Sequence, residues 1–148
     1  MLLRKYMSKI GIGSATVDLV LDKETYSPGE KVTGTLYIKG GTIPQKIKQL
    51  QCDLMKINNQ ADQQSIASIT LFAPDIIDPA DCTKIPFEFV LPKHLPATTD
   101  SLTYRFKTTL VFEEGIDSLD HDTIQIFKNK PSGGENDEKN MEKYSVHL

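Results

Sequence analysis

Hydrophobic and polar residues alternate along most of the middle of this chain. The longest run extends from Leu102 to Phe112, where every second side chain is apolar or is Thr108. A second run at period two consists of Ile85, Phe87, Phe89 and Leu91. Alternation at period two is typical of a β-strand with one buried face, so both runs predict strands whose apolar residues face a core.

Looser runs predict further strands over residues 16–21, 32–38, 47–57, 66–72 and 123–127. Pro28-Gly29 predicts a tight turn, because proline presets φ and glycine accepts a positive φ. Pro86 has the opposite parity to its apolar neighbours, which favours an edge position or a bulge, and Gly34 is interpreted as a bulge. Residues 58–64 are predicted to form a polar loop.

Roughly seven or eight short strands without an amphipathic helix between them indicate an all-β fold, an antiparallel immunoglobulin-like β-sandwich. A length of 148 residues suits one such domain. We expect a short amphipathic segment over 1–14, the sandwich over 15–128 and a polar tail over 129–148. Residues 131–148 are predicted to be disordered, with a frayed helix over 135–144 as the alternative.

The first ten residues have a helical pattern of their own, which predicts a short N-terminal helix. Its apolar side is formed by Leu2, Leu3, Tyr6, Met7 and Ile10. This side either packs on the sandwich as an intramolecular lid or contacts a partner or an anionic membrane surface. The candidate contact residues are Leu2, Leu3, Arg4, Lys5, Tyr6 and Lys9. So short a segment binds a membrane only marginally, which favours the lid.

Composition and charge argue against several classes of protein. With a net charge of −3, the chain is a poor nucleic-acid binder, and we expect no nucleic-acid partner. No apolar run approaches the roughly 20 residues of a transmembrane helix. Two cysteines are too few for a disulfide scaffold or a four-cysteine zinc site. We expect a cytoplasmic chain in which Cys52 is a buried free thiol and Cys82 lies beside a turn; a Cys52–Cys82 bridge is the alternative, which a reducing cytosol disfavours.

Carboxylates are concentrated between residues 113 and 122. The candidates for a hard cation such as Ca²⁺, which takes about six to eight oxygens, are Asp117, Asp120 and Asp122. Their spacing lacks the central glycine and the distal glutamate of an EF-hand loop. The favoured interpretation is a solvated acidic loop, and a docking patch for a basic partner is the other alternative. A second acidic set, interpreted as a polar turn, comprises Asp75, Asp78 and Asp81.

The sequence contains no motif for catalysis or for a cofactor. Gly11-Ile12-Gly13 lacks a third glycine and precedes a strand, so it does not match a nucleotide-binding loop. There is no Gly-x-Ser-x-Gly nucleophile motif. The three histidines lack the spacing of zinc ligands; they are His94, His121 and His147. We therefore expect no enzymatic activity and no cofactor.

Several segments resemble the N-terminal domain of arrestins: 26–38, 85–92 followed by Leu95-Pro96, and 101–112. More narrowly, 10–21, 38–41 and 115–122 resemble the bacterial sporulation-control family of arrestin-like proteins. The resemblance covers about residues 10–128 and consists mostly of turn and core signals. It implies a sandwich of the arrestin N-terminal type and a cytoplasmic regulator of sporulation that acts through protein contacts.

Members of that family have two tandem sandwiches, whereas this sequence contains one. We expect a face left uncovered in this chain to bind an unidentified protein partner or a second copy of the chain. The favoured function is a non-enzymatic interaction module that acts through the edges and loops of its sandwich. The alternative is a peripheral membrane adaptor that uses the basic N-terminal segment.

Overall fold

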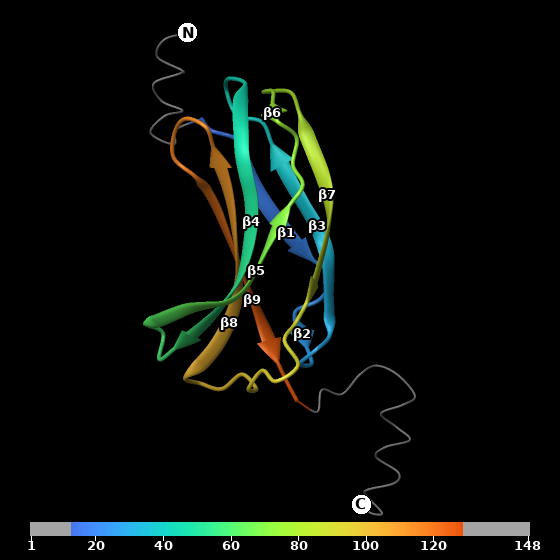
Figure 1. Ribbon diagram of the computed structural model, residues 1–148, viewed down its shortest axis with the longest axis vertical. Helices are drawn as coiled ribbons and strands as arrows, with labels where there is room; N and C mark the ends of the chain where they lie inside the picture. The colour runs from blue at the N-terminus through green and yellow to red at the C-terminus, as the bar shows by residue number, and fades with distance from the viewer. Residues whose placement is uncertain (1–12, 129–148) are drawn as a thin grey trace, which may run out of the picture.

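The computed structural model describes residues 13–128, and every regular element within them is a β-strand (Figure 1). The predicted N-terminal helix and polar tail lie outside the described residues. The strands are β1 (Thr16–Leu21), β2 (Thr25–Tyr26), β3 (Lys31–Lys39), β4 (Gln45–Asn58), β5 (Asp62–Leu71), β6 (Ile76–Ile77), β7 (Cys82–Val90), β8 (Leu102–Phe112) and β9 (Ser118–Ile126).

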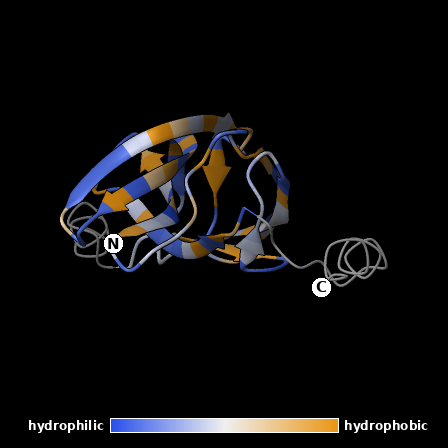
Figure 2. Cartoon of the chain, turned by 90° about the horizontal axis from the view of Figure 1, so that it is seen from below, coloured by the Kyte–Doolittle hydropathy of each residue, from blue (hydrophilic) through white to orange (hydrophobic). Residues whose placement is uncertain are grey.

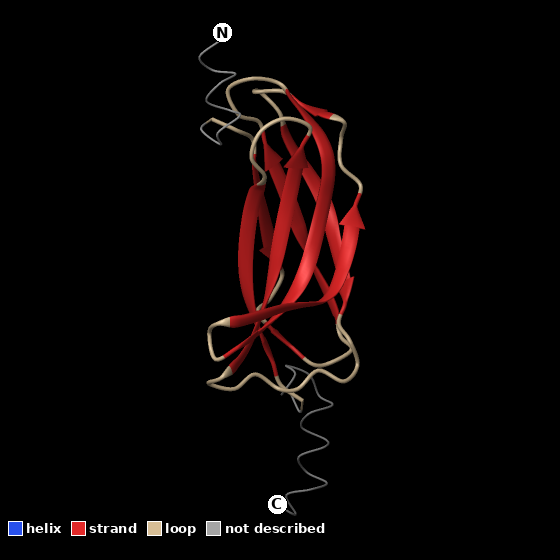
Figure 3. Ribbon diagram, turned by 60° about the vertical axis from the view of Figure 1, so that its left-hand side comes forward, coloured by secondary structure: helices blue, strands red, loops and turns tan. Residues whose placement is uncertain are grey.

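The strands form a smaller and a larger sheet (Figure 3). The smaller sheet has the order β1-β3-β7, and the larger has the order β2-β9-β8-β4-β5, with β6 paired to the start of β4. Only β2 and β9 run parallel among the described pairs, over two residues. Hydrophobic and hydrophilic residues alternate along the strands in Figure 2. The all-β class predicted from the alternation is therefore confirmed.

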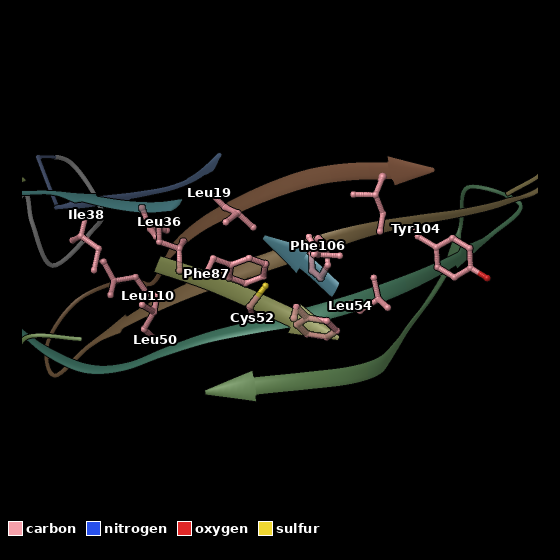
Figure 4. Packing of buried hydrophobic residues seen from close by; sticks show 14 of the residues in the cluster. Leu19, Leu36, Ile38, Leu50, Cys52, Leu54, Phe87, Tyr104, Phe106 and Leu110 are labelled. Carbon is pink, nitrogen blue, oxygen red and sulfur yellow. The ribbon is translucent and has the colours of Figure 1, made fainter. Parts of the chain in front are cut away.

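Aromatic residues on the inner faces join the two sheets. The ring of Phe106 in β8 meets Phe87 and Phe89 of β7 edge-on, with centroids 5.6 and 5.0 Å apart. Pairs of this kind contribute about 0.5–1.5 kcal/mol beyond their buried area. Figure 4 shows leucines of both sheets packed around the same cluster. The inner faces predicted for 85–91 and 102–112 are thus confirmed, although Ile85 and Leu102 are only partly buried.

The predicted Pro28-Gly29 turn joins β2 to β3. Gly29 has a φ of +81°, which a residue with a side chain rarely adopts. Glu30 N donates to Ser27 O at 3.1 Å and closes the turn, and Gly29 N donates to Pro92 O at 3.0 Å. The second bond fastens the turn to the segment that follows β7.

Gly34 does not form the predicted bulge. β3 pairs with β7 in continuous register through Gly34, and its register with β1 runs without a shift up to the last pair, Leu21 with Gly34. The glycine is needed for another reason: a Cβ at this position would lie 2.4 Å from Val20 O. A glycine within a strand signals either a bulge or a close backbone approach, and here the close approach applies. The register shifts of the larger sheet occur in β4.

Two boundaries also differ from those predicted. The polar loop expected over 58–64 is shorter, because β5 already begins at Asp62, and Asn59 and Gln60 make the turn at positive φ. β9 begins at Ser118, so Asp120 and Asp122 belong to a strand and not to a solvated loop. In both segments the ladder to a neighbouring strand holds polar residues in extended conformation, which hydropathy alone does not indicate.

Candidate interaction edges and the Asp120–Asp122 pair

Each sheet of the described sandwich ends in two strands that have a neighbour on one side only. These are β1 and β7 in the smaller sheet, and β2 and β5 in the larger sheet. The outer N–H and C=O groups of an edge strand can pair with a strand from another chain. Because β2 is only two residues long, β1, β7 and β5 are the edges that could accept a strand.

A side chain of the larger sheet occupies the free edge of β1. Leu19 N in β1 donates a hydrogen bond to Asp120 Oδ2 in β9 at 2.7 Å. Hydrogen bonds to an ionised carboxylate are among the stronger ones in proteins. A strand that added to β1 would have to displace this carboxylate, so we regard the β1 edge as closed.

Asp122 lies two residues after Asp120 and faces the same side of β9. Its Oδ2 is buried and has no donor within residues 13–128. Burial, a hydrogen bond with Asp120 and the negative charges of Asp120 and Asp18 together raise the pKa of Asp122 to about 7, and burial is the largest of these causes. Asp122 therefore keeps its proton in mildly acidic solution and releases it around neutral pH.

Asp117, the third residue of the predicted cation set, does not join this pair. It is exposed in the turn between β8 and β9. Within the described part of the chain, no three His, Cys, Asp or Glu side chains are arranged to hold a metal ion. One sequence signal for the pair is parity, because Asp120 and Asp122 continue the same inner face as Ile124 and Ile126.

His121 faces the opposite, outer side of β9, where it is paired in register with Lys107 of β8. Partial burial lowers the pKa of His121, and the positive charges of Arg105 and Lys107 lower it further. His121 is therefore neutral at pH 7, and the positive charge of this outer surface comes from Arg105 and Lys107.

The β7 edge carries a proline near its centre. Pro86 pairs in register with Thr35 of β3, and β7 has no neighbour on its other side among the described strands. The prediction that Pro86 lies at an edge is therefore confirmed. Proline has no N–H to donate, and the flanking Lys84 adds a charge. Both features discourage strand addition at an edge.

β5 is the longest edge without such an obstruction, with ten residues that include neither proline nor lysine. The directions of the backbone groups in β5 follow from one hydrogen bond, in which Glu113 N donates to Lys46 O at 3.0 Å. This bond shows that the backbone groups of Glu113, directly after β8, point toward β4, and it thereby determines which residues of β8 do the same. Backbone groups in an antiparallel ladder alternate in direction. The registers of β4 with β8 and with β5 carry this alternation across the sheet. The backbone N–H and C=O of Ile69 therefore point toward β4, and those of Ser68 and Thr70 point away from β4.

Contacts on both faces hold β5 in place. Its inner side chains pack against the core; they are Ile66, Ala67, Ile69 and Leu71. On the outer face, Ser65 Oγ donates to Asp53 Oδ1 at 3.1 Å, and Gln51 Nε2 donates to Ser68 Oγ at 3.0 Å. β5 is thus fixed by its side chains and by β4, while no strand within residues 13–128 pairs with its outer edge.

Two residues of the second acidic set, Asp78 and Asp81, form a turn as predicted, whereas Asp75 lies before β6. Asp78 N donates to Asp81 Oδ2 at 2.9 Å, and Asp81 N donates to Asp78 O at 2.9 Å. Gly40 N donates to Asp81 O at 3.0 Å, which ties the turn to the end of β3. The Asp81 carboxylate therefore has a structural part in the turn.

Both cysteines are free, Cys52 buried and Cys82 exposed at the start of β7. Thr108 Oγ1 donates to Cys52 Sγ at 3.6 Å. Burial raises the pKa of the Cys52 thiol to about 12, so it stays protonated and unreactive.

The predicted contact residues of the N-terminal segment lie outside the described residues: Leu2, Leu3, Arg4, Lys5, Tyr6 and Lys9. From residue 13 to residue 128, no helix has the length and apolarity needed to cross a membrane.

Comparison with known proteins decides the family. Residues 3–132 match the family described as SpoOM protein. The chain belongs to the Spo0M family. The sporulation-control protein Spo0M of Bacillus subtilis strain 168 is 35% identical over 130 residues, which are 83% of this chain and 50% of that protein. The sporulation-control family suggested by the sequence resemblance is therefore confirmed.

The crystal structure of Spo0M from Bacillus subtilis has a similar fold, with a TM-score of 0.71 at 34% identity over 78% of this chain and 50% of that chain. This Spo0M-family chain thus spans about half the length of its Bacillus subtilis relative. A superoxide reductase (neelaredoxin) from Ignicoccus hospitalis reaches a TM-score of 0.41 at 11% identity, over 76% of this chain and 80% of that chain. This second likeness is too distant to bear on function.

Proposed function

We propose that this Spo0M-family chain is a non-enzymatic regulatory module with a sandwich of the arrestin N-terminal type, and that a protein partner adds a strand to β5. The observation that carries the proposal is the open edge of β5, where the backbone groups of Ser68 and Thr70 face outward. Membership of the family supports a role in sporulation control, the role that names the Bacillus subtilis relative.

An added strand would extend the larger sheet beyond β5. Its backbone would bond to the outward N–H and C=O groups, which gives affinity without regard to sequence. Its side chains would alternate between the inner side, next to Ile69 and Leu71, and the outer side, next to the polar Ser68 and Thr70. Partner selection would therefore depend on an apolar–polar alternation in the partner strand.

We place the module in the cytoplasm. Its two free thiols, Cys52 and Cys82, suit a reducing compartment. The exposed Cys82 in particular would be open to oxidation elsewhere.

The experiment removes the outward donors of β5 while keeping the strand. In the variant Ser68→Pro/Thr70→Pro, proline replaces residues whose N–H groups do not bond to β4, a position that an edge strand tolerates. The matched control, Ser68→Ala/Thr70→Ala, loses the same side-chain contacts but keeps both N–H groups. Each tagged full-length variant is used to capture proteins from sporulating cells of the native host.

The wild-type chain and the alanine control are expected to retain the same saturable protein. The proline variant should lose about tenfold or more of it, because two backbone hydrogen bonds of about 1 kcal/mol each are removed. Retention of the partner by a proline variant with a wild-type thermal transition would exclude β5 as the site. Recovery of a second copy of this chain alone would reassign the edge to self-association.

A further inference from the structure

One end of the sandwich, which we call the Gly13 end, is where the described chain begins (Figure 1). It comprises the end of β3 with the loop 40–44, the start of β4, the segment 72–77 and the turn 113–117. Thr42 N donates to Gly13 O at 2.8 Å, and Ala15 N donates to Gln45 Oε1 at 2.7 Å. The start of the described chain is therefore fastened to the segment that leads into β4.

The start of β4 also holds the other parts of this end. Lys46 pairs with Ile76 of β6, and its carbonyl accepts the hydrogen bond from Glu113 N. Ile47 N donates to Asp75 O at 2.7 Å. Neighbouring strands are about 4.8 Å apart, so these parts lie within a few strand spacings of one another.

Three large apolar side chains at the Gly13 end face solvent. Phe72 is 90% exposed, Ile116 is 54% exposed and Ile76 is 48% exposed. A single exposed apolar residue is ordinary on a protein surface. Three of them around the start of one strand indicate a surface that something covers.

A buried hydrogen-bond donor at the same end lacks an acceptor. Gln45 is only 7% exposed, and its Oε1 is used by Ala15 N. Its Nε2 is buried and has no hydrogen-bond partner within residues 13–128. Buried amide groups are nearly always hydrogen-bonded, so Gln45 Nε2 is a donor that a further backbone carbonyl can satisfy, close to where residues 1–12 join the sandwich.

Residues 1–12 have a composition that fits this surface. They contain the five apolar residues and the three cations already described. The exposed carboxylates at the Gly13 end outnumber its lysines, Lys39 and Lys46, and include Asp75, Glu113, Glu114 and Asp117. Twelve residues span about 18 Å as a helix or about 40 Å when extended, enough to cross three strand spacings.

We propose that residues 1–12 dock on the Gly13 end of their own chain, with their apolar side chains against Phe72, Ile76 and Ile116 and their cations facing Glu113, Glu114 and Asp117. The docked segment covers the exposed apolar residues and brings backbone carbonyls near Gln45 Nε2. This contact is independent of strand addition at β5.

The test uses the full chain with a nitroxide spin label at residue 8, in the variant Ser8→Cys/Cys82→Ser. Ser8 is neither an apolar nor a cationic residue of the segment, and buried Cys52 is not labelled. In ¹H–¹⁵N spectra, docking is expected to broaden the amide signals of Ile76 and Ile116. The signals of Asn59 and Asp100, at the opposite end, should stay sharp.

Charge reversal at the two ends separates a specific contact from general attraction. Glu113→Lys/Glu114→Lys/Asp117→Lys should abolish the broadening. The matched reversal at the opposite end, Glu24→Lys/Asp62→Lys/Asp100→Lys, should leave it intact. An equal effect of the two reversals, or sharp signals at Ile76 and Ile116 in the parent chain, would overturn the proposal. Sharp signals together with sedimentation on phosphatidylglycerol vesicles would assign the segment to a membrane surface instead.

Discussion

The backbone N–H of Leu19 in β1 is bonded to the side-chain carboxylate of Asp120 in β9. This hydrogen bond connects an edge of the smaller sheet to the larger sheet. Asp122 stands next to that carboxylate and carries a pKa of about 7. Asp122 therefore places a second negative charge beside the Leu19–Asp120 hydrogen bond as the pH rises through about 7.

The stability of the fold is expected to fall with rising pH because of Asp122. Its pKa is about 7 in the folded chain against a usual 3.8. A group with a raised folded-state pKa stabilises the fold fully below its unfolded-state pKa, and this contribution is lost as the pH rises through the folded-state pKa. Asp122→Asn, which stays neutral, should lose less stability than the wild type between about pH 4 and about pH 8.

Urea unfolding at both ends of that range measures the effect. Asp100→Asn removes an exposed carboxylate far from the pair and should keep the wild-type pH dependence. Equal pH dependence in the wild type and in Asp122→Asn would show that Asp122 does not retain a proton in the folded chain.

Phe106 is expected to be among the most costly side chains to truncate. It is fully buried and contacts both Phe87 and Phe89. Phe106→Ala should lower the free energy of unfolding by about 3–5 kcal/mol. Val90→Ala is the control, since Val90 is 66% exposed at the end of β7 and its truncation should change stability by no more than about 0.5 kcal/mol. A loss below about 1 kcal/mol for Phe106→Ala would contradict the packing described.

Gly34→Ala should destabilise the smaller sheet, because the added Cβ would collide with Val20 O. Overpacking of this kind costs about 1–3 kcal/mol. Thr35→Ala, at the next position of β3, should cost less than about 1 kcal/mol. Denaturant midpoints of the two variants give the comparison, and a Gly34→Ala chain as stable as the wild type would mean that β1 and β3 separate readily there.

The two thiols should differ sharply in reactivity. Cys82 is exposed, whereas Cys52 is buried with a pKa of about 12. A thiol reagent near pH 8 should modify about one thiol per native chain quickly, and the second only after unfolding. Cys82→Ser identifies the fast thiol. Rapid modification of that variant would show that the core around Cys52 opens.

The strands with the strongest alternation could be predicted from sequence, and the reason is physical. In 102–112 each inner position is apolar or Thr108, so burial alone specifies the strand and its face. β6 could not be predicted, because its two residues depend on their pairing with Gln45 and Lys46. Such pairing is a property of the folded chain and leaves no periodic pattern.

The Asp120–Asp122 pair could not be predicted from the sequence. Carboxylates close together suggested a solvated loop, although their parity matches that of Ile124 and Ile126. The partner of Asp120, the N–H of Leu19, is a backbone group and has no signature in the sequence. In the same way, the open edge of β5 follows from the order of the strands, which local patterns do not determine.

Hydrogen exchange at the β5 edge tests the central claim most directly. Amide exchange of the full chain is measured alone and with the protein captured from the native host. Strand addition predicts slower exchange at Ser68 and Thr70 in the complex, with no change at Lys84 and Glu88 of the β7 edge. Unchanged exchange at Ser68 and Thr70 with the partner bound would contradict the account.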